Sequence, residues 1–503
     1  MPRPFRPLPA PDAPLAAIDM GSNSFRLEIG QVHGHRYQRQ RYLKETVRLG
    51  AGLDAQQCLT EEAMQRGLAC LRGFADHLGE LSPVQVRAVA TQTLREARNR
   101  NAFLQRAEAA LGQPIEVISG REEARLIYAG VSFLQPSTTP RLTIDIGGRS
   151  TELILGQGRV PGAAESFPVG SVSLSMRYFP DGRLSAEAFR AAQVAAGAEF
   201  EEALSTFAPA LWQEALGSSG TAGAVADVLR ANGVTDGRIT PAGLRWLIER
   251  CIALGTVERL DLPGLKPERR AVLPGGLAIL YTLAAHFEIA ELRPAKGALR
   301  QGVIVDLHER LAARQPRATA HDPRDDSVRV LQQRFGVDTA QATRVARLAL
   351  VMYEQLAPDA SPEERQELWW AAQLHEMGLM VSHHDHHRHS AYLLDHVDAA
   401  GFSQSQQRRL GELVLGQRGG LRKLEAPLAR DGFAWQLLSL RLAVIACHAR
   451  ANGPLAAPTL VRRGRSVRLH GGAALANPRT RHLLGEEAQA WARGGALDLV
   501  LAD

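Results

Sequence analysis

The stretch LTIDIGGRSTELILG, residues 142–156, decides how this chain is interpreted. An apolar run ends at Asp145, turns through Gly147 and Gly148, and resumes as a second apolar run. This pattern predicts two antiparallel strands joined by a tight turn. Glycine lets the backbone of such a turn approach an anion, and its amides can donate to phosphate oxygens. Because Arg149 lies inside the turn, the stretch predicts either a phosphate cradle or a simple hairpin.

The same pattern occurs earlier, in LAAIDMGSNSFRLEIGQV, residues 15–32. Both stretches read as an apolar strand, an aspartate, a turn with glycine and serine, and a second apolar strand. Turn residues of these kinds are typical of structural hairpins, but the repetition favours a shared phosphate site. Strands and helices also alternate after the first hairpin, which predicts an α/β domain. The repeat therefore predicts a duplicated α/β domain whose two turns face one another across a cleft.

Composition divides the chain further. Residues 313–325 are polar, charged and proline-bearing, which is typical of a linker, and helical periodicity dominates beyond them. The expected organisation is a disordered tail over 1–14, α/β domains over 15–135 and 136–312, a linker over 313–325, a helical domain over 326–455, and a small C-terminal α+β segment over 456–503. Helices of the third domain are expected at 339–357, 361–381, 390–402, 403–417 and 434–452. In the last segment, strands are expected at 466–470 and 497–503, around a helix at 477–494.

Charge and composition limit the functional classes. A formal net charge of +6 and a pI near 9.4 favour an anionic partner, such as nucleic acid, nucleotide or inorganic polyphosphate. The aromatic content of 5% argues against the interleaved basic and aromatic surface of single-strand nucleic-acid binders. Four cysteines without paired spacing, and no signal peptide or transmembrane run, predict a cytoplasmic protein and leave only peripheral membrane contact open.

Three further glycine-rich segments are read as turns before predicted helices. They are GSSGTA at 217–222, LPGGLAIL at 273–280 and GALRQGVIVDL at 297–307. Backbone amides at the start of a helix can bind an anion, so each segment is a candidate for phosphate binding.

In this order, the motifs resemble the exopolyphosphatase and guanosine pentaphosphate phosphatase (Ppx/GppA) family, within the superfamily of acetate and sugar kinases, Hsp70 and actin. The segments that carry the resemblance are DMGSNSFRL, VATQTLREARN, EVISGREEARLIYAGV, TIDIGGRSTEL, FPVGSVSLSMRYF, GSSGTA, LPGGLAIL and GALRQGVIVDL. The segment LHEMGLMVSHHDHHRHSAYLL is similar to the family's degenerate HD-type domain. The resemblance implies two actin-like, ribonuclease H-like domains followed by an HD-like helical domain.

The resemblance also implies an activity, namely hydrolysis of a terminal phosphoanhydride. We expect an exopolyphosphatase that releases orthophosphate from inorganic polyphosphate; guanosine pentaphosphate is the alternative substrate. Family members depend on Mg²⁺, in some cases with a monovalent cation such as K⁺, and are often homodimers. The family's general base is the second glutamate of the Glu-Glu-Ala-Arg motif, here Glu123. By residue type alone, Glu122 and Glu123 cannot be separated.

The remaining site residues follow from the same resemblance. Asp19, Asp145 and Glu152 match the acidic residues around magnesium and the catalytic water. Arg95 matches the arginine on the terminal phosphates, and Arg26 is either a second such arginine or a surface charge. Phosphate-binding donors are expected at Ser22, Asn23, Ser24, Gly147, Gly148, Ser150, Thr151, Gly220 and Thr221.

The chain departs from the family pattern at three places. Arg149 replaces the third glycine of the second loop; if that position needed positive φ, arginine would cost about 1 kcal/mol or more. Its guanidinium is expected to clamp phosphate, point to solvent, or crowd the cleft. Lys296 and Gln301 replace acidic residues, either to suit a polyanion or by surface drift. Arg149 also keeps open a weakly active binding regulator of polyphosphate or alarmones, whereas the Glu123 motif argues against an ATP-dependent kinase.

The helical domain contains a dense histidine cluster, which suggests a metal site. Active HD phosphohydrolases bind metal through a histidine, a His-Asp pair and a later aspartate. Here the pair is His375-Glu376, with Gln341 near the first position and Gln417 in an altered later segment. We therefore expect a structural or polyanion-binding role for Arg388 and the cluster. Its histidines are His383, His384, His386, His387 and His389.

Overall fold

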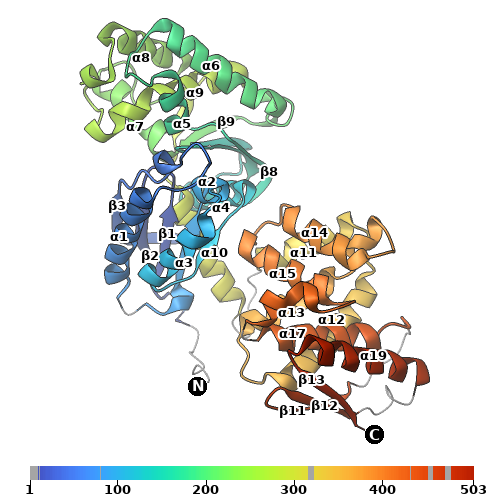
Figure 1. Ribbon diagram of the computed structural model, residues 1–503. Coiled ribbons are helices and arrows are strands. Elements are labelled where there is room, and N and C mark those ends of the chain that lie inside the picture. The colour runs from blue at the N-terminus through green and yellow to red at the C-terminus, as the bar shows by residue number, and fades with distance from the viewer. Residues whose placement is uncertain are drawn as a thin grey trace. The chain divides into compact units, whose positions relative to one another are not determined.

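The computed structural model describes residues 9–10, 12–79, 81–314, 322–430, 432–450, 457–470 and 477–502. They form two compact units, one over Leu8–His321 and one over Asp322–Asp503 (Figure 1). Residues 1–8 and 11 of the expected tail and residues 315–321 of the expected linker lie outside the described residues. The helices that flank this linker end at Ala313 and begin at Pro323.

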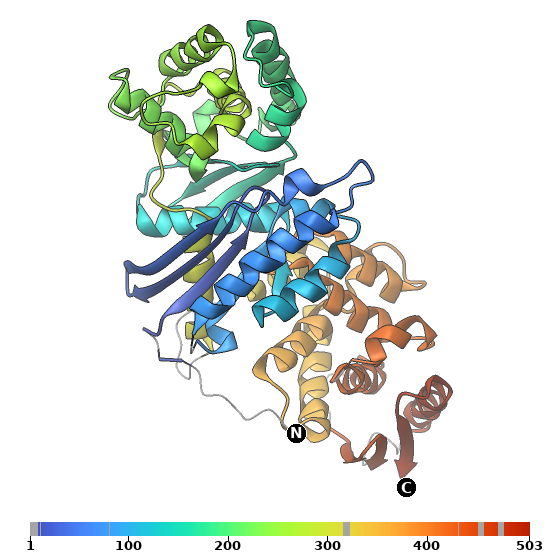
Figure 2. The ribbon, with the colours of Figure 1, turned by 60° about the vertical axis from the view of Figure 1, so that its left-hand side comes forward.

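The first α/β domain contains a sheet in the order β3-β2-β1-β4-β5. Its strands are β1 (Leu15–Met20), β2 (Phe25–His33), β3 (Arg36–Glu45), β4 (Val86–Ala90) and β5 (Ile115–Val117). β1 to β3 form the antiparallel ribbon visible in Figure 2, and β4 and β5 run parallel to β1. β1 is buried on both faces, because Ile18 packs with helices α1 (Glu61–Leu78) and α3 (Arg100–Leu111), whereas Ala17 belongs to a second core. A strand covered on both sides is expected to be largely apolar, and β1 is apolar except for Asp19 near its end.

The second domain repeats this order as β8-β7-β6-β9-β10. Its strands are β6 (Arg141–Ile146), β7 (Thr151–Gln157), β8 (Val160–Phe167), β9 (Glu214–Ser218) and β10 (Leu292–Pro294). One face is covered by α5 (Ser171–Tyr178), α6 (Ala186–Phe200), α7 (Ser219–Ala231), α8 (Pro241–Leu254) and α9 (Leu273–His286) (Figure 1). The duplicated actin-like fold is thereby confirmed. β3 and β8 were not predicted from the sequence, because neither the mostly exposed β3 nor the mostly half-buried β8 has an alternating apolar pattern.

Two helices pack between the sheets, α4 (Gly120–Leu134) and α10 (Leu299–Ala313), in one core with residues of both domains. Their backbones touch at glycines. A methyl group on Gly302 would lie 1.7 Å from the Leu126 carbonyl oxygen, and one on Gly130 would lie 2.5 Å from the Ala298 carbonyl oxygen. This close crossing fixes α4 at the junction of the two α/β domains.

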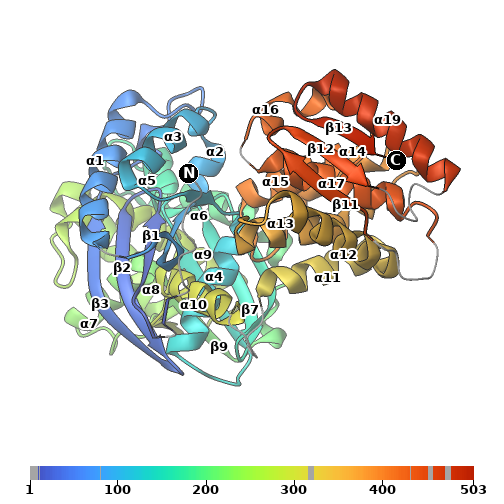
Figure 3. The ribbon, with the colours of Figure 1, turned by 90° about the horizontal axis from the view of Figure 1, so that it is seen from below.

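The second unit is a helical domain with a small sheet. Its helices are α11 (Pro323–Arg334), α12 (Thr339–Leu356), α13 (Pro362–Leu374), α14 (His386–His396), α15 (Gln404–Gly416), α16 (Glu425–Leu428) and α17 (Phe433–Ala446). The sheet orders β11 (Thr459–Arg463), β12 (Ser466–His470) and β13 (Asp498–Ala502), and α19 (Pro478–Gly494) packs beside β13 (Figure 3). The expected helical domain and C-terminal α+β segment are confirmed, with β11 as an additional strand. Three helices differ in extent from the expected ranges, since α13 ends at Leu374, α14 covers 386–396 and α17 ends at Ala446.

All four cysteines are free thiols. Among the described residues, none of the helices combines the length and the apolar character needed to cross a membrane.

The crossing of α4 and α10 generates a stability prediction. Gly302→Ala forces a methyl group against a carbonyl oxygen, so the free energy of unfolding should fall by about 1–3 kcal/mol. Urea unfolding followed by circular dichroism measures the change. Gly73→Ala in α1 is the matched control, because a methyl group there meets no atom within 4 Å. The control should gain about 0.5–1 kcal/mol from better helix propensity, and equal effects of both variants would contradict the close crossing.

Candidate active site

A cavity of about 500 Å³ lies between the two hairpin turns. The end of β1 and the turn after it contribute Asp19, Gly21, Ser22, Asn23 and Ser24, and the end of β6 and the turn after it contribute Asp145, Gly147, Gly148 and Ser150. The two repeated segments therefore border one space. Gly220, at the start of α7, also borders it, so this cavity collects amides and hydroxyls from both domains.

The first turn of α4 distinguishes Glu122 from Glu123. Glu123 borders the cavity, and Arg95 Nη1 donates to its Oε2 at 2.8 Å. Glu122 is fully buried and accepts from Arg125 Nε at 2.7 Å. The side chain that can act on a ligand is therefore Glu123, as the resemblance implies.

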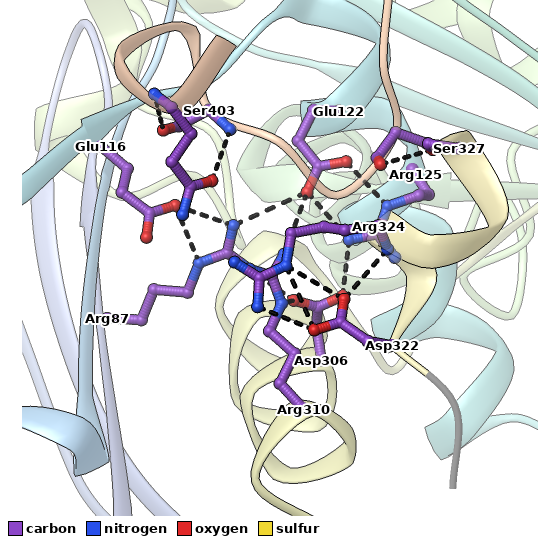
Figure 4. Close-up of polar contacts among 12 residues, drawn as sticks. Arg87, Glu116, Glu122, Arg125, Asp306, Arg310, Asp322, Arg324, Ser327 and Ser403 are labelled. Carbon is purple, nitrogen blue, oxygen red and sulfur yellow. Dashed lines mark hydrogen bonds and ion pairs between the residues drawn. The ribbon is translucent and has the colours of Figure 1, made fainter. Parts of the chain in front are cut away.

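Below this turn, a buried ionic cluster holds α4 (Figure 4). Arg87, Arg125 and Arg310 each approach Asp306 of α10 to 2.6 Å. Burial disfavours the charged form of Asp306, but these guanidinium groups outweigh it and hold its pKa well below the ordinary value. The cluster also includes Glu116 and Glu122, which pair with Arg87 at 3.0 and 3.6 Å. Breaking one partner of such a cluster would leave a buried charge uncompensated, so the cluster fixes the start of α4.

Several carboxyl groups converge at the cavity. Burial raises the pKa of Glu123 to about 7; Arg95 lowers it, whereas Asp19 and Asp145 raise it further. Burial raises the pKa of Asp145 to about 6, against a hydrogen bond with Ser218 and the charge of Arg26. Burial, with Glu123 and Asp145, raises the pKa of Glu152 well above its ordinary value. Because these buried carboxyl groups raise one another's pKa values, a bound cation would stabilise their ionised forms.

The donor set fits a hard divalent cation. Magnesium prefers oxygen ligands and is commonly held by one or two carboxylates together with phosphate and water. Among the described residues, no three histidine, cysteine, aspartate or glutamate side chains are grouped closely enough to hold an ion. Asp145 and Asp19, at the ends of β6 and β1, fit the smaller number of ligands. Asp19 also accepts from Arg26 Nη1 at 2.9 Å, which places Arg26 in the site and not on the surface.

Five residues expected in the site do not border the cavity. Arg95 reaches it only through its hydrogen bond to Glu123, Arg149 pairs with Glu96, and the other three are Thr151, Thr221 and Glu152. Thr151 Oγ1 donates to the Val169 carbonyl at 2.6 Å, and Thr221 Oγ1 donates to the Ile146 carbonyl at 3.1 Å. Glu152 lies opposite Asp145 in the β6–β7 pair and accepts from Ser166 Oγ at 2.8 Å. The structure places these side chains behind the loops, where they support them.

The glycine-rich segments also have different roles. GSSGTA opens α7, with Ser219 in a left-handed conformation (φ 79°). LPGGLAIL is not a turn: it lies within α9, and Gly275 allows the backbone of α5 to pack closely, since a methyl group there would lie 2.5 Å from the Ser171 carbonyl. Gly297 packs against Gly130 in the same way, at 2.3 Å. The anion-binding expectation for LPGGLAIL is therefore replaced by close helix packing.

Arg149 does not border the cavity. Its Nη2 lies 2.7 Å from Glu96 Oε2, and its Nη1 donates to the Gly50 carbonyl at 3.4 Å. The residue is not among those with positive φ, so the loop accepts arginine without left-handed strain. The sequence left three possibilities open for Arg149: a phosphate clamp, a solvent-directed side chain, or a side chain that crowds the cleft. None of them matches this position, because the guanidinium pairs with Glu96 of the first domain outside the cavity.

One wall of the cavity is lined by cationic side chains, and the sequence alone did not predict this grouping. It consists of Arg39 and Lys44 from β3, with Lys266 and Arg269 from the segment before α9. None of these residues takes part in an ion pair within the described part of the chain. Burial, then Arg269 and Arg26, lower the pKa of Lys44, which shows mutual repulsion within the wall. A bound polyanion would relieve it.

The two other departures from the family pattern lie near this wall. Lys296 borders the cavity. Gln301 is buried, and its Nε2 lies 2.7 Å from both carboxylate oxygens of Glu28. A glutamate at this position would repel Glu28, so glutamine follows from local packing and not from surface drift.

In the helical unit, the positions that correspond to HD metal ligands bond to the backbone. Gln341 Nε2 donates to the Cys447 carbonyl at 2.8 Å, and Gln417 Nε2 donates to the His375 carbonyl at 2.6 Å. Glu376 pairs with Arg450. A cavity of about 710 Å³ adjoins these residues, but the grouping needed for a metal ion is absent from the described residues, the histidine cluster included.

Comparison with known proteins gives two family matches. Residues 30–311 match the model of the Ppx/GppA phosphatase family, and residues 324–470 match the model of Ppx/GppA phosphatase domain III.

Solved structures share the fold of the α/β part. An exopolyphosphatase-like protein is 26% identical (TM-score 0.55), with 60% of this chain and 99% of that chain covered. An exopolyphosphatase from Cytophaga hutchinsonii is 24% identical (TM-score 0.53), with 59% and 98% covered. The Ppx/GppA family member from Aquifex aeolicus is 23% identical (TM-score 0.51), with 60% and 99% covered.

The burial of Glu123 generates a titration prediction. In the ligand-free protein its carboxyl should lose its proton near pH 7, and Arg95→Ala should raise that pKa, because Arg95 favours the ionised form. NMR of protein with ¹³C-labelled glutamate carboxyls measures the titration, and Glu123→Gln assigns the signal. Arg106→Ala, which removes a half-exposed arginine paired with Glu61, is the control and should change nothing. A Glu123 pKa in the ordinary glutamate range would contradict the burial argument.

Proposed function

The chain belongs to the Ppx/GppA phosphatase family and hydrolyses phosphoanhydride bonds, and on that basis we propose that it is an exopolyphosphatase. Its proposed substrate is inorganic polyphosphate, from whose ends it releases orthophosphate. The observation that supports this choice is the cationic wall in the cavity that Glu123 borders. Its four cations form no ion pair within 4 Å among the described residues, and Glu268 is the acidic residue that acts on Lys44 and Arg269.

The cavity divides the substrate into two regions. The terminal phosphate lies between the two turns, where the backbone amide of Gly148 and the hydroxyls of Ser22 and Ser150 can donate to its oxygens. The phosphates that follow lie along the cationic wall. A chain with one negative charge or more per phosphate would replace the repulsion between Lys44 and Arg269 with attraction.

The proposed chemistry is an in-line attack of water on the terminal phosphorus. Glu123 takes a proton from that water as its oxygen bonds to phosphorus. The bond from phosphorus to the bridging oxygen breaks with its electron pair on that oxygen, so the shortened polyphosphate is the leaving group and the terminal phosphate is released as orthophosphate. Arg95 holds the Glu123 carboxylate at 2.8 Å and so orients the accepting oxygen. A pKa of about 7 suits a general base that works near neutral pH. Magnesium, held by Asp145 and Asp19 with Glu152 behind them, would supply neutralisation of the phosphate charge.

Guanosine pentaphosphate is the second candidate substrate, because its 5′ end presents the same terminal anhydride. The observation that favours it is Tyr42, an aromatic ring that borders the cavity and on which a base can stack. The guanidinium carbon of Arg300 lies over this ring, 5.0 Å from its centroid, and so occupies a face on which a base would stack. Polyphosphate is therefore the better-supported substrate. A homodimer, a cytoplasmic location and a monovalent cation stay predictions from the family resemblance.

The assignment of the base predicts the effect of one substitution. Glu123→Gln should lower kcat for phosphate release by about 10²–10⁴-fold, because no other group takes the proton. Release from long polyphosphate and from guanosine pentaphosphate is measured side by side, in the presence of Mg²⁺. Glu165→Gln, at a half-exposed carboxyl on β8, is the matched control. Wild-type rates in the Glu123 variant would refute the base, and faster release from guanosine pentaphosphate would select the second substrate.

The cationic wall predicts a dependence on chain length. Lys44→Ala combined with Lys266→Ala should raise KM for long polyphosphate by about tenfold or more, because charge-assisted hydrogen bonds contribute about 1.5–3 kcal/mol each. KM for tripolyphosphate should change much less, since a short chain does not reach the whole wall. Arg106→Ala serves as the surface-charge control. Equal changes for long and short chains would contradict the assignment of the wall to the later phosphates.

A further inference from the structure

Arg149 belongs to the second domain by sequence but contacts the first domain by its side chain. Its Nη2 and Nε lie 2.7 and 3.0 Å from Glu96 Oε2, at the end of helix α2 (Gln92–Glu96). Both side chains are about one-fifth to one-quarter exposed (19% and 24%), so solvent screens this pair less than a surface pair. The contact therefore joins the β6–β7 turn to α2 across the domain boundary.

Helix α2 continues this contact toward the proposed base. Gln92 Nε2 donates to Glu96 Oε1 at 2.6 Å, and Gln92 Oε1 accepts from Arg95 Nε at 2.9 Å and from Nη2 at 2.5 Å. The amide of Gln92 has only one orientation that satisfies both neighbours, because its NH₂ must face the carboxylate and its oxygen must face the guanidinium. These side chains lie three and four positions apart and so share one face of the helix.

Arg95 completes the connection. Its Nη1 donates to Glu123 Oε2 at 2.8 Å and to the Ile118 carbonyl at 3.0 Å. Side chains thus connect the second-domain loop to Glu123 without a break. We call this connection the polar chain; its members are Arg149, Glu96, Gln92, Arg95 and Glu123.

The loop end of the polar chain is equally fixed. Gly147 N donates to the Ser150 carbonyl at 2.9 Å, and the amides of Val172 and Ser173, in the first turn of α5, donate to the Gly148 carbonyl at 2.8 and 3.1 Å. The position of the Arg149 backbone is therefore the position of the loop that holds the terminal phosphate in the proposed function.

From this geometry we infer that Arg149 is a positioning residue that couples the phosphate loop of the second domain to the orientation of Glu123 in the first. The inference rests on the proposed function, in which Glu123 is the base. A glycine at position 149 has no side chain and could not make this connection. The role of Arg149 is to act through Glu96, Gln92 and Arg95, and not to bind phosphate.

The two roles differ in their kinetic effects. A residue that binds phosphate directly contributes to KM, whereas a residue that orients the base contributes to kcat. Its effect should also vanish when its partner is absent, because neighbours in one network are not additive.

A double-mutant cycle tests the coupling on the full chain with long polyphosphate. Arg149→Ala and Glu96→Ala should each lower kcat by about 3- to 30-fold with KM changed less than twofold, and the double variant should be no slower than the slower single variant. Arg149→Lys should restore part of kcat, because lysine reaches Glu96 with a single charged bond. Arg106→Ala, which breaks a pair with Glu61 elsewhere in the domain, should leave kcat unchanged.

Three outcomes of these measurements would contradict the inference. Multiplied effects in the double variant, a rise in KM alone, or an unchanged kcat in Arg149→Ala would overturn the coupling. A second readout separates this inference from the proposed function: the NMR signal of the Arg95 Nε–H group should shift in Arg149→Ala and stay fixed in Arg106→Ala. If the wild type releases no phosphate, the proposed function fails, while an unmoved Arg95 signal refutes the polar chain independently.

Discussion

The close crossing of α4 and α10 is the constraint on which the site depends. With glycine at Gly130 and Gly302, the two backbones touch, and the arginines around Asp306 lock the start of α4 to α10. A helix held in this way between two sheets can bring its first turn to the space that both hairpins border. The carboxylate of Glu123 then faces Asp145 without belonging to either sheet. In the proposed function, the duplicated domains supply the phosphate donors and the crossing helix supplies the base.

Much of this arrangement was predictable because it depends on local chemistry. Apolar strands broken by aspartate, glycine and serine specify the same turn wherever they occur, so the repeat at residues 15–32 and 142–156 indicated the duplicated fold and the shared cavity. The choice between Glu122 and Glu123, in contrast, could not be made from local chemistry. Both residues favour the start of a helix, and the buried arginines Arg87 of β4 and Arg125 of α4 pair with Glu122, which leaves Glu123 toward the cavity.

The features that the sequence did not reveal are assembled from distant segments. The cationic wall joins β3 to the segment before α9, more than 200 residues along the chain, and no local pattern links Lys44 to Lys266. LPGGLAIL has the composition of a turn, yet its glycines serve helix packing. Thr151 and Thr221 have the residue type of phosphate donors, but their hydroxyls bond to the backbone. Arg149 could be recognised in the sequence as an unusual residue in a glycine turn. Its partner Glu96 is 53 positions away and could be identified only from the structure.

Because burial raises the pKa values of Glu123 and Asp145, both carboxyl groups change protonation state near neutral pH. With pKa values of about 7 for Glu123 and about 6 for Asp145, these carboxyl groups are partly protonated at neutral pH in the ligand-free site. A cation that stabilises the ionised carboxylates must displace these protons into the surrounding buffer, so binding and proton release are one linked equilibrium. In acidic medium, protons compete with the cation for the same oxygens. In the proposed function, the burial that prepares Glu123 to act as a base therefore also makes the affinity of the site for a cation depend on pH.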